Sequence, residues 1–258
     1  MPMVTVLCNG RNFPDIEAIF LDKDGTLADV AAYLSRWGHR QAQLMQAQLP
    51  GTQGPVLQTL GFTAEGLTAS GLLAVGNRQE TIVGIAAAAA TVGCPWVQAI
   101  DLARTTTCIA DRQCSPKALY TPLLPGALDF LARLRQANLK IIMVSADSQG
   151  NLEEFVQHYQ LHPYFDRIQG VSDHCPTKTD PSFLPMACDA IGVSPRQGLV
   201  IGDAATDLRM AQIARGFIGF LGGWRPVLSA TDILSVDRPA EDPIACGFAT
   251  NFSQIEIA

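Results

Sequence analysis

The sequence predicts an α/β protein with a doubly wound parallel sheet, into which a helical segment is inserted. Short apolar runs alternate with helix-like patterns over residues 1–30 and 119–258. Residues 31–118 instead are rich in alanine, glutamine and leucine and contain almost no strand-like run. Because strand-then-helix repetition is typical of βα units around a parallel sheet, we expect the two outer segments to form one α/β core. The segment between them is expected to fold as a separate helical insertion.

Five apolar runs predict the strands of the core. Each is continuously apolar rather than alternating, which is typical of strands that are buried on both faces of a parallel sheet. The runs are AIFLD, KIIMVS, IQGVS, GLVIGD and GFIGFLGG. Helix-like patterns lie between them, and the one after the insertion ends at Asn138, a helix stop signal.

Both ends of the chain predict further short strands. TVLCNGRNF, near the N-terminus, indicates a strand that ends in an Asn-Gly turn and pairs at an edge. Near the C-terminus, TDILSV and SQIEI indicate a final strand and an edge piece.

Residues 31–118 predict four or five helices. Asn77 lies three residues before Glu80, which is the spacing of a helix capping box. Thr63, just before Ala64 and Glu65, fits a second helix N-cap.

One uncharged stretch in the insertion, residues 81–100, has the length of a membrane-spanning helix. Its five consecutive alanines are only weakly hydrophobic, and Gly93 and Pro95 interrupt it. We therefore expect packed helices in a soluble protein and no membrane partner.

Composition limits the partners and the compartment. The formal net charge is -6 and no basic stripe is visible, so a nucleic-acid partner is not expected. The chain has seven cysteines, an odd number, and no two of them have C-x-x-C spacing. This pattern disfavours a disulfide framework and a zinc ribbon, and it favours a reducing compartment. No basic segment with an apolar core opens the chain, so we expect a cytoplasmic protein without a secretory signal. The oligomeric state stays open, with a homodimer among the alternatives.

Chemically competent side chains follow four of the predicted strands. In chain order they are Asp22 with Asp24, Ser145, Lys178, and Asp203 with Asp207. Each alone has an ordinary structural explanation, such as an Asp-Gly turn, a helix cap or a solvated lysine. The carboxyl ends of strands in a doubly wound sheet, however, meet at one edge. Four unrelated structural roles at the same edge would be a poor explanation for these side chains, so we expect them to form one functional site.

Phosphoryl transfer accounts for this combination of residues. The reaction needs a nucleophile, a cation that offsets the charge of the phosphoryl oxygens, and donors that fix those oxygens. Asp22 is expected to be the nucleophile and to form an aspartyl phosphate. Asp24 is expected to protonate the leaving oxygen and later to take a proton from water.

The same residues predict how charge is balanced at this site. Oxygen ligands from Asp22, the Asp24 carbonyl and Asp203 suit Mg²⁺, which takes few carboxylates and keeps several waters. Ser145 supplies a hydroxyl donor and Lys178 a positive charge for the phosphoryl group.

Four short segments resemble a known family. FLDKDGTL, IIMVSA, KTDP and VIGDAATD match, in order and spacing, the motifs of the haloacid-dehalogenase-like hydrolase superfamily, which read D-x-D-x-T, an apolar run ending in Ser or Thr, Lys, and G-D-x-x-x-D. This resemblance implies a Rossmann-like core, Mg²⁺ dependence and the aspartyl-phosphate route. It also implies that Thr26 binds phosphate and that Asp207 is a metal ligand. The helical insertion resembles the type 1 cap of phosphoglycolate phosphatase-like members.

Some residues depart from the family pattern. Lys23 stands between the two aspartates, as in the P-type transport ATPases, but those proteins need many membrane-spanning helices. The true dehalogenases lack the second aspartate as acid and base, so Asp24 favours a phosphatase. Thr-Asp-Pro follows Lys178 instead of the commoner Pro-x-Pro. Asp147, two residues after Ser145, is either a helix cap or a group behind the site.

We therefore expect a Mg²⁺-dependent phosphatase for a small phosphorylated metabolite, because a helical cap restricts access to larger substrates. Arg78, at a predicted loop-helix junction of the insertion, is the cap residue expected to contact the substrate. Two alternatives stay open. A phosphomutase of the β-phosphoglucomutase type shares every motif. A receiver-like phosphoaspartate signalling module also uses Asp, Mg²⁺, Ser or Thr and Lys, but Asp24 and the insertion disfavour it.

Overall fold

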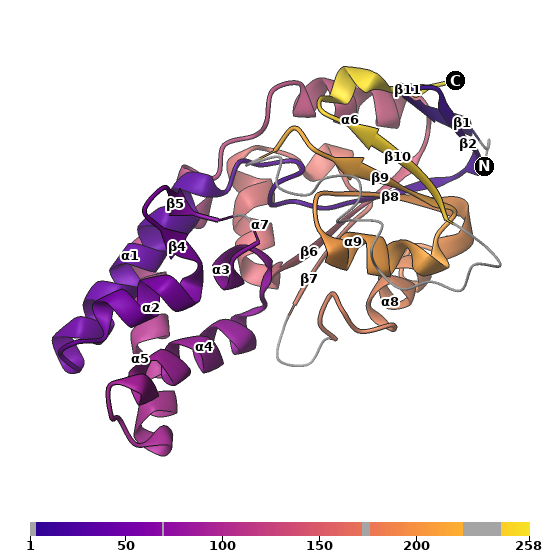
Figure 1. Ribbon diagram of the computed structural model, residues 1–258. Helices are drawn as coiled ribbons and strands as arrows, with labels where there is room; N and C mark the ends of the chain where they lie inside the picture. Colours follow the sequence, from indigo (N-terminus) through magenta and orange to yellow (C-terminus); the bar gives the residue numbers. More distant parts are fainter. Residues whose placement is uncertain (1–3, 69, 172–175, 224–243) are drawn as a thin grey trace. The chain divides into compact units, whose positions relative to one another are not determined.

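The computed structural model describes residues 4–68, 70–171, 176–223 and 244–258, and the chain folds as two compact units (Figure 1). The first unit comprises Met1–Asp29 and Pro122–Ala258, and we call it the α/β unit. The second comprises Val30–Thr121, and we call it the helical unit.

A six-stranded parallel sheet forms the centre of the α/β unit, as predicted. Its strand order is β10-β9-β8-β3-β6-β7. The strands are β3 (Ala18–Leu21), β6 (Lys140–Ser148), β7 (Arg167–Val171), β8 (Gly198–Gly202), β9 (Gly216–Phe220) and β10 (Ala245–Ala249). The chain runs from β3 outward through β6 and β7, then returns to β8 on the other side of β3. The carboxyl ends of β3 and β8 therefore lie at the point where the strand order reverses, which is where ligands bind in sheets of this kind.

Apolar burial fixes the central strand in place. All four residues of β3 are buried, and the same is true of β8 and β9. Phe20 of β3 belongs to one buried cluster with Ile142 of β6, Val200 of β8 and Phe183, the first residue of a helix that packs on the sheet. The continuous apolar runs therefore reflect strands that are covered on both faces.

In the described part of this unit, four helices connect or follow these strands: α6 (Ala127–Gln136), α7 (Gln149–His158), α8 (Phe183–Asp189) and α9 (Ala205–Met210). Asn138 has a φ of 58° just after α6, so the predicted stop signal is confirmed. The strand predicted as KIIMV is longer than expected, because β6 continues to Ser148 with a change of register between Val144 and Ser148. Ser145 consequently lies within this irregular strand end rather than after it.

The two ends of the chain form a separate antiparallel sheet, ordered β11-β1-β2. β1 (Val4–Cys8) and β2 (Arg11–Ile16) are joined by Asn9 and Gly10, whose φ values of 47° and 83° match a two-residue hairpin turn. β11 (Ile255–Ile257) confirms the strand predicted for SQIEI. The segment TDILSV lies outside the described residues.

The helical unit contains α1 (Ala31–Gln48), α2 (Gln53–Leu60), α3 (Leu72–Val75), α4 (Arg78–Thr91) and α5 (Trp96–Cys114), followed by the 3-10 helix η1 (Lys117–Tyr120). A two-stranded ribbon of β4 (Phe62–Thr63) and β5 (Gly66–Leu67) lies between α2 and α3. Trp37, Met45 and Ile85 belong to the buried core of this unit. Alanine-rich helix faces let α4 and α5 approach closely, which explains the composition of the insertion.

One of the two predicted helix caps is confirmed and the other is wrong. The Asn77 side chain accepts a hydrogen bond from Glu80 N at 2.9 Å, and the Glu80 carboxylate accepts one from Asn77 N at 2.8 Å. Thr63 instead lies in β4, where its hydroxyl accepts from Glu65 N and donates to the Gly66 carbonyl. A hydroxyl that closes a tight turn uses the same local bonds as a helix cap, so the two cannot be distinguished by residue type.

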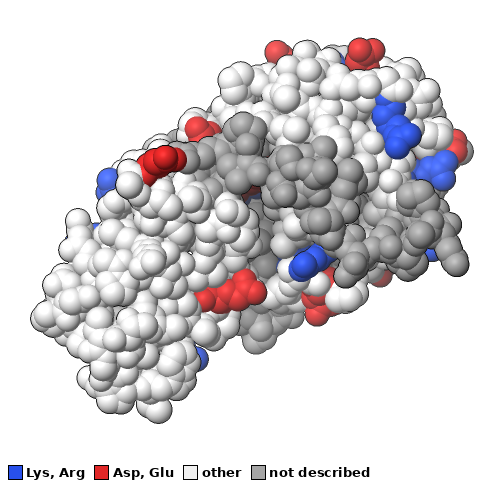
Figure 2. Space-filling view, in the orientation of Figure 1, with Lys and Arg blue, Asp and Glu red and all other residues white. Residues whose placement is uncertain are grey.

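The uncharged stretch at residues 81–100 does not form one helix. It is divided between α4 and α5 by a turn at Gly93, whose φ is 92°. Among the described residues, no helix combines the length and the apolar character needed to cross a membrane. Figure 2 shows one face of the molecule, on which the described Lys and Arg side chains stand singly or in small groups rather than in a stripe.

Asp166 supports a prediction about the stability of the sheet. Its carboxylate pairs with Lys140 Nζ at 2.7 Å and Arg135 Nη1 at 2.8 Å, and accepts a bond from Ile141 N at 3.0 Å. Burial raises the pKa of Asp166, but these donors outweigh burial and hold the pKa below its ordinary value. We expect Asp166→Asn to lower the free energy of unfolding at pH 7 by about 1–2 kcal/mol.

The pH dependence of this loss follows from the direction in which folding shifts the pKa of Asp166. The pKa of Asp166 is lower in the folded than in the unfolded chain, so its contribution is present above about pH 4 and is lost as pH falls through the folded pKa. Urea unfolding at pH 7 and pH 3 should show the two proteins converging at the lower pH. Asp15→Asn, which breaks an exposed pair with Arg215, is the matched control and should change little at either pH. If wild type and Asp166→Asn differed by the same free energy of unfolding at pH 7 and pH 3, the stabilising role of the Asp166 carboxylate would be contradicted.

Candidate active site

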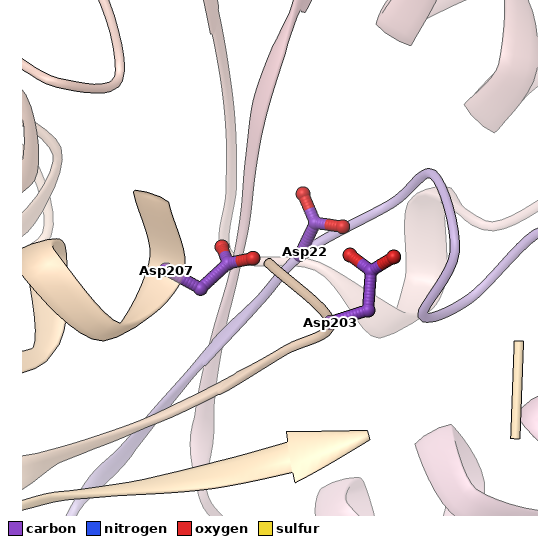
Figure 3. A group of neighbouring side chains, drawn as sticks. All are labelled: Asp22, Asp203 and Asp207. Atoms are coloured by element: carbon purple, nitrogen blue, oxygen red, sulfur yellow. The ribbon is translucent and has the colours of Figure 1, made fainter. Parts of the chain in front are cut away.

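Three carboxylates meet at the carboxyl ends of β3 and β8 (Figure 3). Asp22 directly follows β3, Asp203 directly follows β8, and Asp207 lies in the first turn of α9. One oxygen of each lies within 4.8 Å of the others. The predicted grouping of these residues at one sheet edge is therefore found in the structure.

Backbone interactions bring Asp22 and Asp203 together. Asp22 N donates to the Ile201 carbonyl at 2.9 Å, which extends the pairing of β3 with β8 by one residue. Gly25 then turns the chain with a φ of 86°. A Cβ atom at Gly25 would lie 2.0 Å from Oδ2 of Asp203, so any other residue at position 25 would displace that carboxylate.

Asp207 is held by the start of its own helix. Its Oδ2 accepts a hydrogen bond from Ala204 N at 3.1 Å, which satisfies one of the free amides at the N-terminus of α9. The side chain is fully buried. Its other oxygen, Oδ1, faces the lysine described next.

Lys178 joins two of the three carboxylates. Its ammonium nitrogen lies 2.5 Å from Oδ1 of Asp22 and 2.6 Å from Oδ1 of Asp207. Burial lowers the pKa of Lys178, but the two carboxylates outweigh it and raise the pKa above its ordinary value. Lys178 is thus a buried side chain whose charged form is favoured by the two carboxylates. The departure from the family pattern after Lys178 leaves this contact intact.

Burial and the nearness of other carboxylates raise the pKa values of Asp22 and Asp203. Burial raises the pKa of Asp22 to about 7, although the Lys178 ammonium acts in the opposite direction. Burial, together with the charges of Asp22 and Asp207, also raises the pKa of Asp203 well above its ordinary value. Three carboxylates and one ammonium leave a formal charge of -2 when all are ionised. A divalent cation bound here would offset that charge.

The donor set fits a hard divalent cation. All three groups offer carboxylate oxygens, which suit Mg²⁺, Ca²⁺ or Mn²⁺, whereas no cysteine or histidine belongs to this group of described residues. The ligand oxygens of one octahedral Mg²⁺ lie about 3–4 Å apart. The observed limit of 4.8 Å therefore needs only a small adjustment of the side chains.

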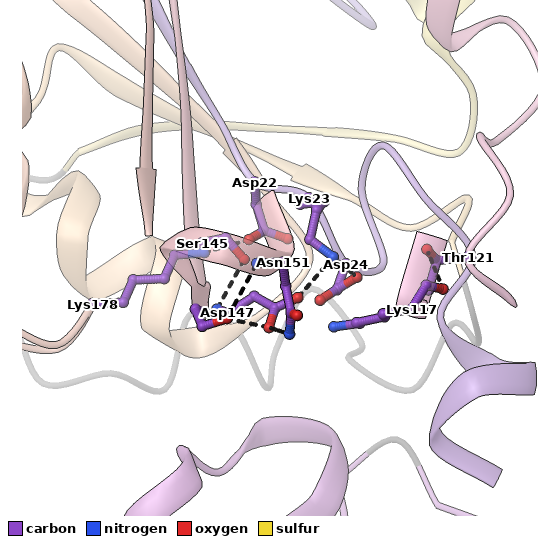
Figure 4. A network of polar contacts seen from close by, with 10 residues as sticks. Asp22, Lys23, Asp24, Lys117, Thr121, Ser145, Asp147, Asn151 and Lys178 are labelled. Carbon is purple, nitrogen blue, oxygen red and sulfur yellow. Dashed lines mark hydrogen bonds and ion pairs between the residues drawn. The ribbon is translucent and has the colours of Figure 1, made fainter. Parts of the chain in front are cut away.

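Asp24, the expected acid and base, lies beside this group and contacts Lys23 (Figure 4). Lys23 Nζ is 2.5 Å from Oδ1 of Asp24. The Asp24 side chain is about a quarter exposed, at 24%, so it is accessible to a substrate. Thr26 is fully buried, and its hydroxyl has no hydrogen-bond partner in the described structure.

The residues around Ser145 resolve an alternative that the sequence left open. Ser145 is buried, and its Oγ accepts a hydrogen bond from Asp147 N at 3.1 Å. Ser148, not Asp147, caps α7 by accepting from Asn151 N. Asp147 instead faces Lys23, with Oδ2 3.2 Å from the ammonium. Lys23 and Asn151 were not predicted as site residues, and the only signal was a lysine between two aspartates.

Arg78, the cap residue predicted to contact substrate, lies in the first turn of α4 in the helical unit. Its guanidinium pairs with Oδ2 of Asp111, and the other oxygen of Asp111 accepts from Trp37 Nε1 at 2.8 Å. More than half of the Arg78 side chain, 56%, is exposed. The structure thus shows a partner for Arg78 within its own unit.

A model of the haloacid dehalogenase-like hydrolase family matches residues 16–215. The chain belongs to this family. The matched range contains all four predicted motifs and the whole helical unit, so the resemblance read from the motifs is confirmed. The Rossmann-like α/β architecture expected for this family is the one observed.

Relatives with assigned names indicate the class of enzyme. A phosphoglycolate phosphatase from Nitrosospira multiformis is 26% identical over 79% of this chain and 82% of its own length. One from Chromobacterium violaceum is 31% identical, but over only 37% of this chain and 43% of its own length. These matches confirm the prediction of a hydrolase of the phosphatase class.

Solved structures of the family share the fold. A subfamily IA hydrolase from Geobacter sulfurreducens has a TM-score of 0.58 at 16% identity, covering 92% of this chain and 93% of its own. At this identity the similarity concerns the fold alone.

Proposed function

We propose that this enzyme is a Mg²⁺-dependent phosphatase that transfers the phosphoryl group of a small metabolite to Asp22 and then to water. The observation that carries this proposal is the position of Asp22, which contacts the Lys178 ammonium and lies within 4.8 Å of Asp203 and Asp207. A nucleophilic carboxylate between an ammonium and a cation site is arranged to receive a phosphoryl group.

The first step forms the aspartyl phosphate. A carboxylate oxygen of Asp22 attacks phosphorus, and the bond from phosphorus to the leaving oxygen breaks. Asp24, in its acid form, gives its proton to that oxygen, so the alcohol leaves neutral. Lys178 and Ser145 hold the phosphoryl oxygens as charge builds on them.

The second step returns Asp22 to its starting state. Asp24, now a carboxylate, takes a proton from water as the water oxygen attacks phosphorus. The bond between phosphorus and Asp22 breaks, which releases inorganic phosphate, restores the Asp22 carboxylate and leaves Asp24 protonated for the next cycle. Asp22, Asp203, Asp207 and the Asp24 carbonyl would hold Mg²⁺, which would supply positive charge to offset that of the phosphoryl group.

We assign the helical unit as a cap that selects the substrate. The chain is similar to enzymes named phosphoglycolate phosphatase, so a short phosphorylated carboxylic acid is the first substrate class to test. Arg78 is the cap residue proposed to contact the substrate, and its contact with Asp111 orients the guanidinium. We further propose a cytoplasmic enzyme without nucleic-acid or membrane partners, based on charge and cysteine usage.

The proposed substrate class is tested by measuring phosphate release from a panel of phosphorylated acids, sugars and nucleotides with Mg²⁺. We expect kcat/KM to be highest for a two- or three-carbon phosphorylated acid. A preference for a hexose phosphate, together with a need for a bisphosphate activator, would instead support the phosphomutase alternative. A phosphoenzyme that persists for minutes without turnover would support the signalling alternative.

A further inference from the structure

We propose that Lys23 is a positioning residue that fixes the carboxylate of Asp24, and that Asp147 anchors Lys23 for this task. This inference rests on the proposed roles of Asp22 and Asp24. It concerns a residue that no part of the four family motifs specifies, since position 23 is the variable position of D-x-D-x-T.

The first observation is the burial of Lys23. Its side chain is only 1% exposed, and it is among the largest fully buried side chains of the chain. The ammonium lies 5.2 Å from the centre of the Phe155 ring on α7. Lysine is seldom fully buried without compensation, since removing an ammonium from water is costly.

The second observation is that Lys23 joins two carboxylates that differ in exposure. Nζ lies 2.5 Å from Oδ1 of Asp24 and 3.2 Å from Oδ2 of Asp147. The Asp24 side chain is 24% exposed and Asp147 only 10%. Lys23 thus links the accessible acid and base to a group behind it.

The third observation is that Asp147 is itself fixed. Its Oδ1 accepts hydrogen bonds from Ser148 N at 2.9 Å and Asn151 Nδ2 at 2.7 Å. Its backbone N donates to Oγ of Ser145. Because Oδ1 is occupied, Oδ2 is directed to Lys23. The start of α7 therefore holds Asp147, which holds Lys23, which holds Asp24 (Figure 4).

Stability alone does not explain this arrangement. A buried ion pair is often no more stabilising than an apolar side chain of similar volume. Apolar side chains at both positions 23 and 147 would avoid the desolvation cost of this ion pair, and methionine at position 23 would still contact Phe155. A lysine that is costly to bury, and that contacts the proposed proton donor, is better explained by the geometry it imposes on that donor.

The leaving group of the substrate provides the test. An alkyl phosphate needs its leaving oxygen to be protonated, whereas p-nitrophenolate leaves without an acid. We expect Lys23→Met to lower kcat/KM for an alkyl phosphate by about 10²-fold, because proton donation contributes about 10²–10⁴-fold. For p-nitrophenyl phosphate we expect a loss of less than about 5-fold. A structural defect would reduce both substrates equally.

Two further variants make the test specific. In an Asp24→Asn background, Lys23→Met should cause no additional selectivity, because Lys23 acts through Asp24. Asp147→Asn should also lower kcat/KM more for the alkyl phosphate than for p-nitrophenyl phosphate, but by a smaller factor than Lys23→Met. This variant keeps the test decisive if Lys23→Met does not fold. The matched control is Lys140→Met, which removes a lysine-carboxylate pair of similar length at the opposite end of β6. It should leave both kcat/KM values unchanged.

The outcomes separate this inference from the proposed function. Equal losses of kcat/KM on both substrates would overturn the proposed role of Lys23, and so would the absence of any loss in both Lys23→Met and Asp147→Asn. If the wild-type protein turns over substrate, neither result affects the proposed phosphatase function. An inactive wild-type protein, or full activity in Asp22→Asn, would instead overturn the proposed function itself.

Discussion

Asp22→Asn should abolish phosphate release from p-nitrophenyl phosphate, with a loss on the order of 10⁴-fold or more in kcat, as for other nucleophile deletions. The amide has nearly the same shape but cannot attack phosphorus. Phosphate release in the presence of saturating Mg²⁺ measures the effect.

The same substitution should not harm the fold. Burial raises the pKa of Asp22 to about 7, which means that the folded chain carries the Asp22 carboxylate at a cost. Removing this charge relieves its repulsion with Asp203 and Asp207, so we expect the melting temperature to stay constant or to rise. Asp15→Asn, at an exposed position, is the matched control and should retain wild-type activity. Near-normal turnover by Asp22→Asn would refute the nucleophile assignment.

Removal of divalent cations should inactivate the enzyme. Three buried or partly buried carboxylates with one ammonium leave an excess of negative charge that repels a phosphate dianion. A bound cation contributes several kcal/mol to phosphoryl transfer, so EDTA should lower kcat by about 10³-fold. Added Mg²⁺ should restore activity.

Two controls identify the ion and its ligands. Ca²⁺ carries the same charge but takes more ligands at longer distances, so it should restore little activity. Asp203→Asn should raise the Mg²⁺ concentration needed for half-maximal activity, because Asp203 is one of the three side-chain carboxylates proposed as ligands. Full turnover after exhaustive chelation would exclude the cation site as described.

The sequence predicted the fold and the centre of the site because both depend on local patterns. Continuous apolar runs mark strands buried on both faces, and the carboxyl ends of such strands meet at one edge. Asp22, Lys178 and Asp203 could therefore be grouped before their contacts were known. In the structure Lys178 and Asp22, which are 156 positions apart, lie in direct contact.

Other features depend on contacts that no local pattern encodes. Lys23 pairs with Asp147 across the interval between two motifs, so its burial could not be foreseen from its neighbours. β1 pairs with β11 at the opposite end of the chain. Thr63 failed as a helix cap because turns and caps use the same short-range hydrogen bonds.

The covalent intermediate is the central claim, and trapping it is the most direct test. With p-nitrophenyl phosphate, whose leaving group needs no acid, Asp24→Asn should form the aspartyl phosphate but hydrolyse it slowly, because no base then activates water. Mixing this variant with ³²P-labelled substrate and Mg²⁺, followed by acid quenching and peptide mapping, should place a hydroxylamine-labile label on Asp22. A label on another residue, or wild-type turnover without any trapped label, would contradict the account.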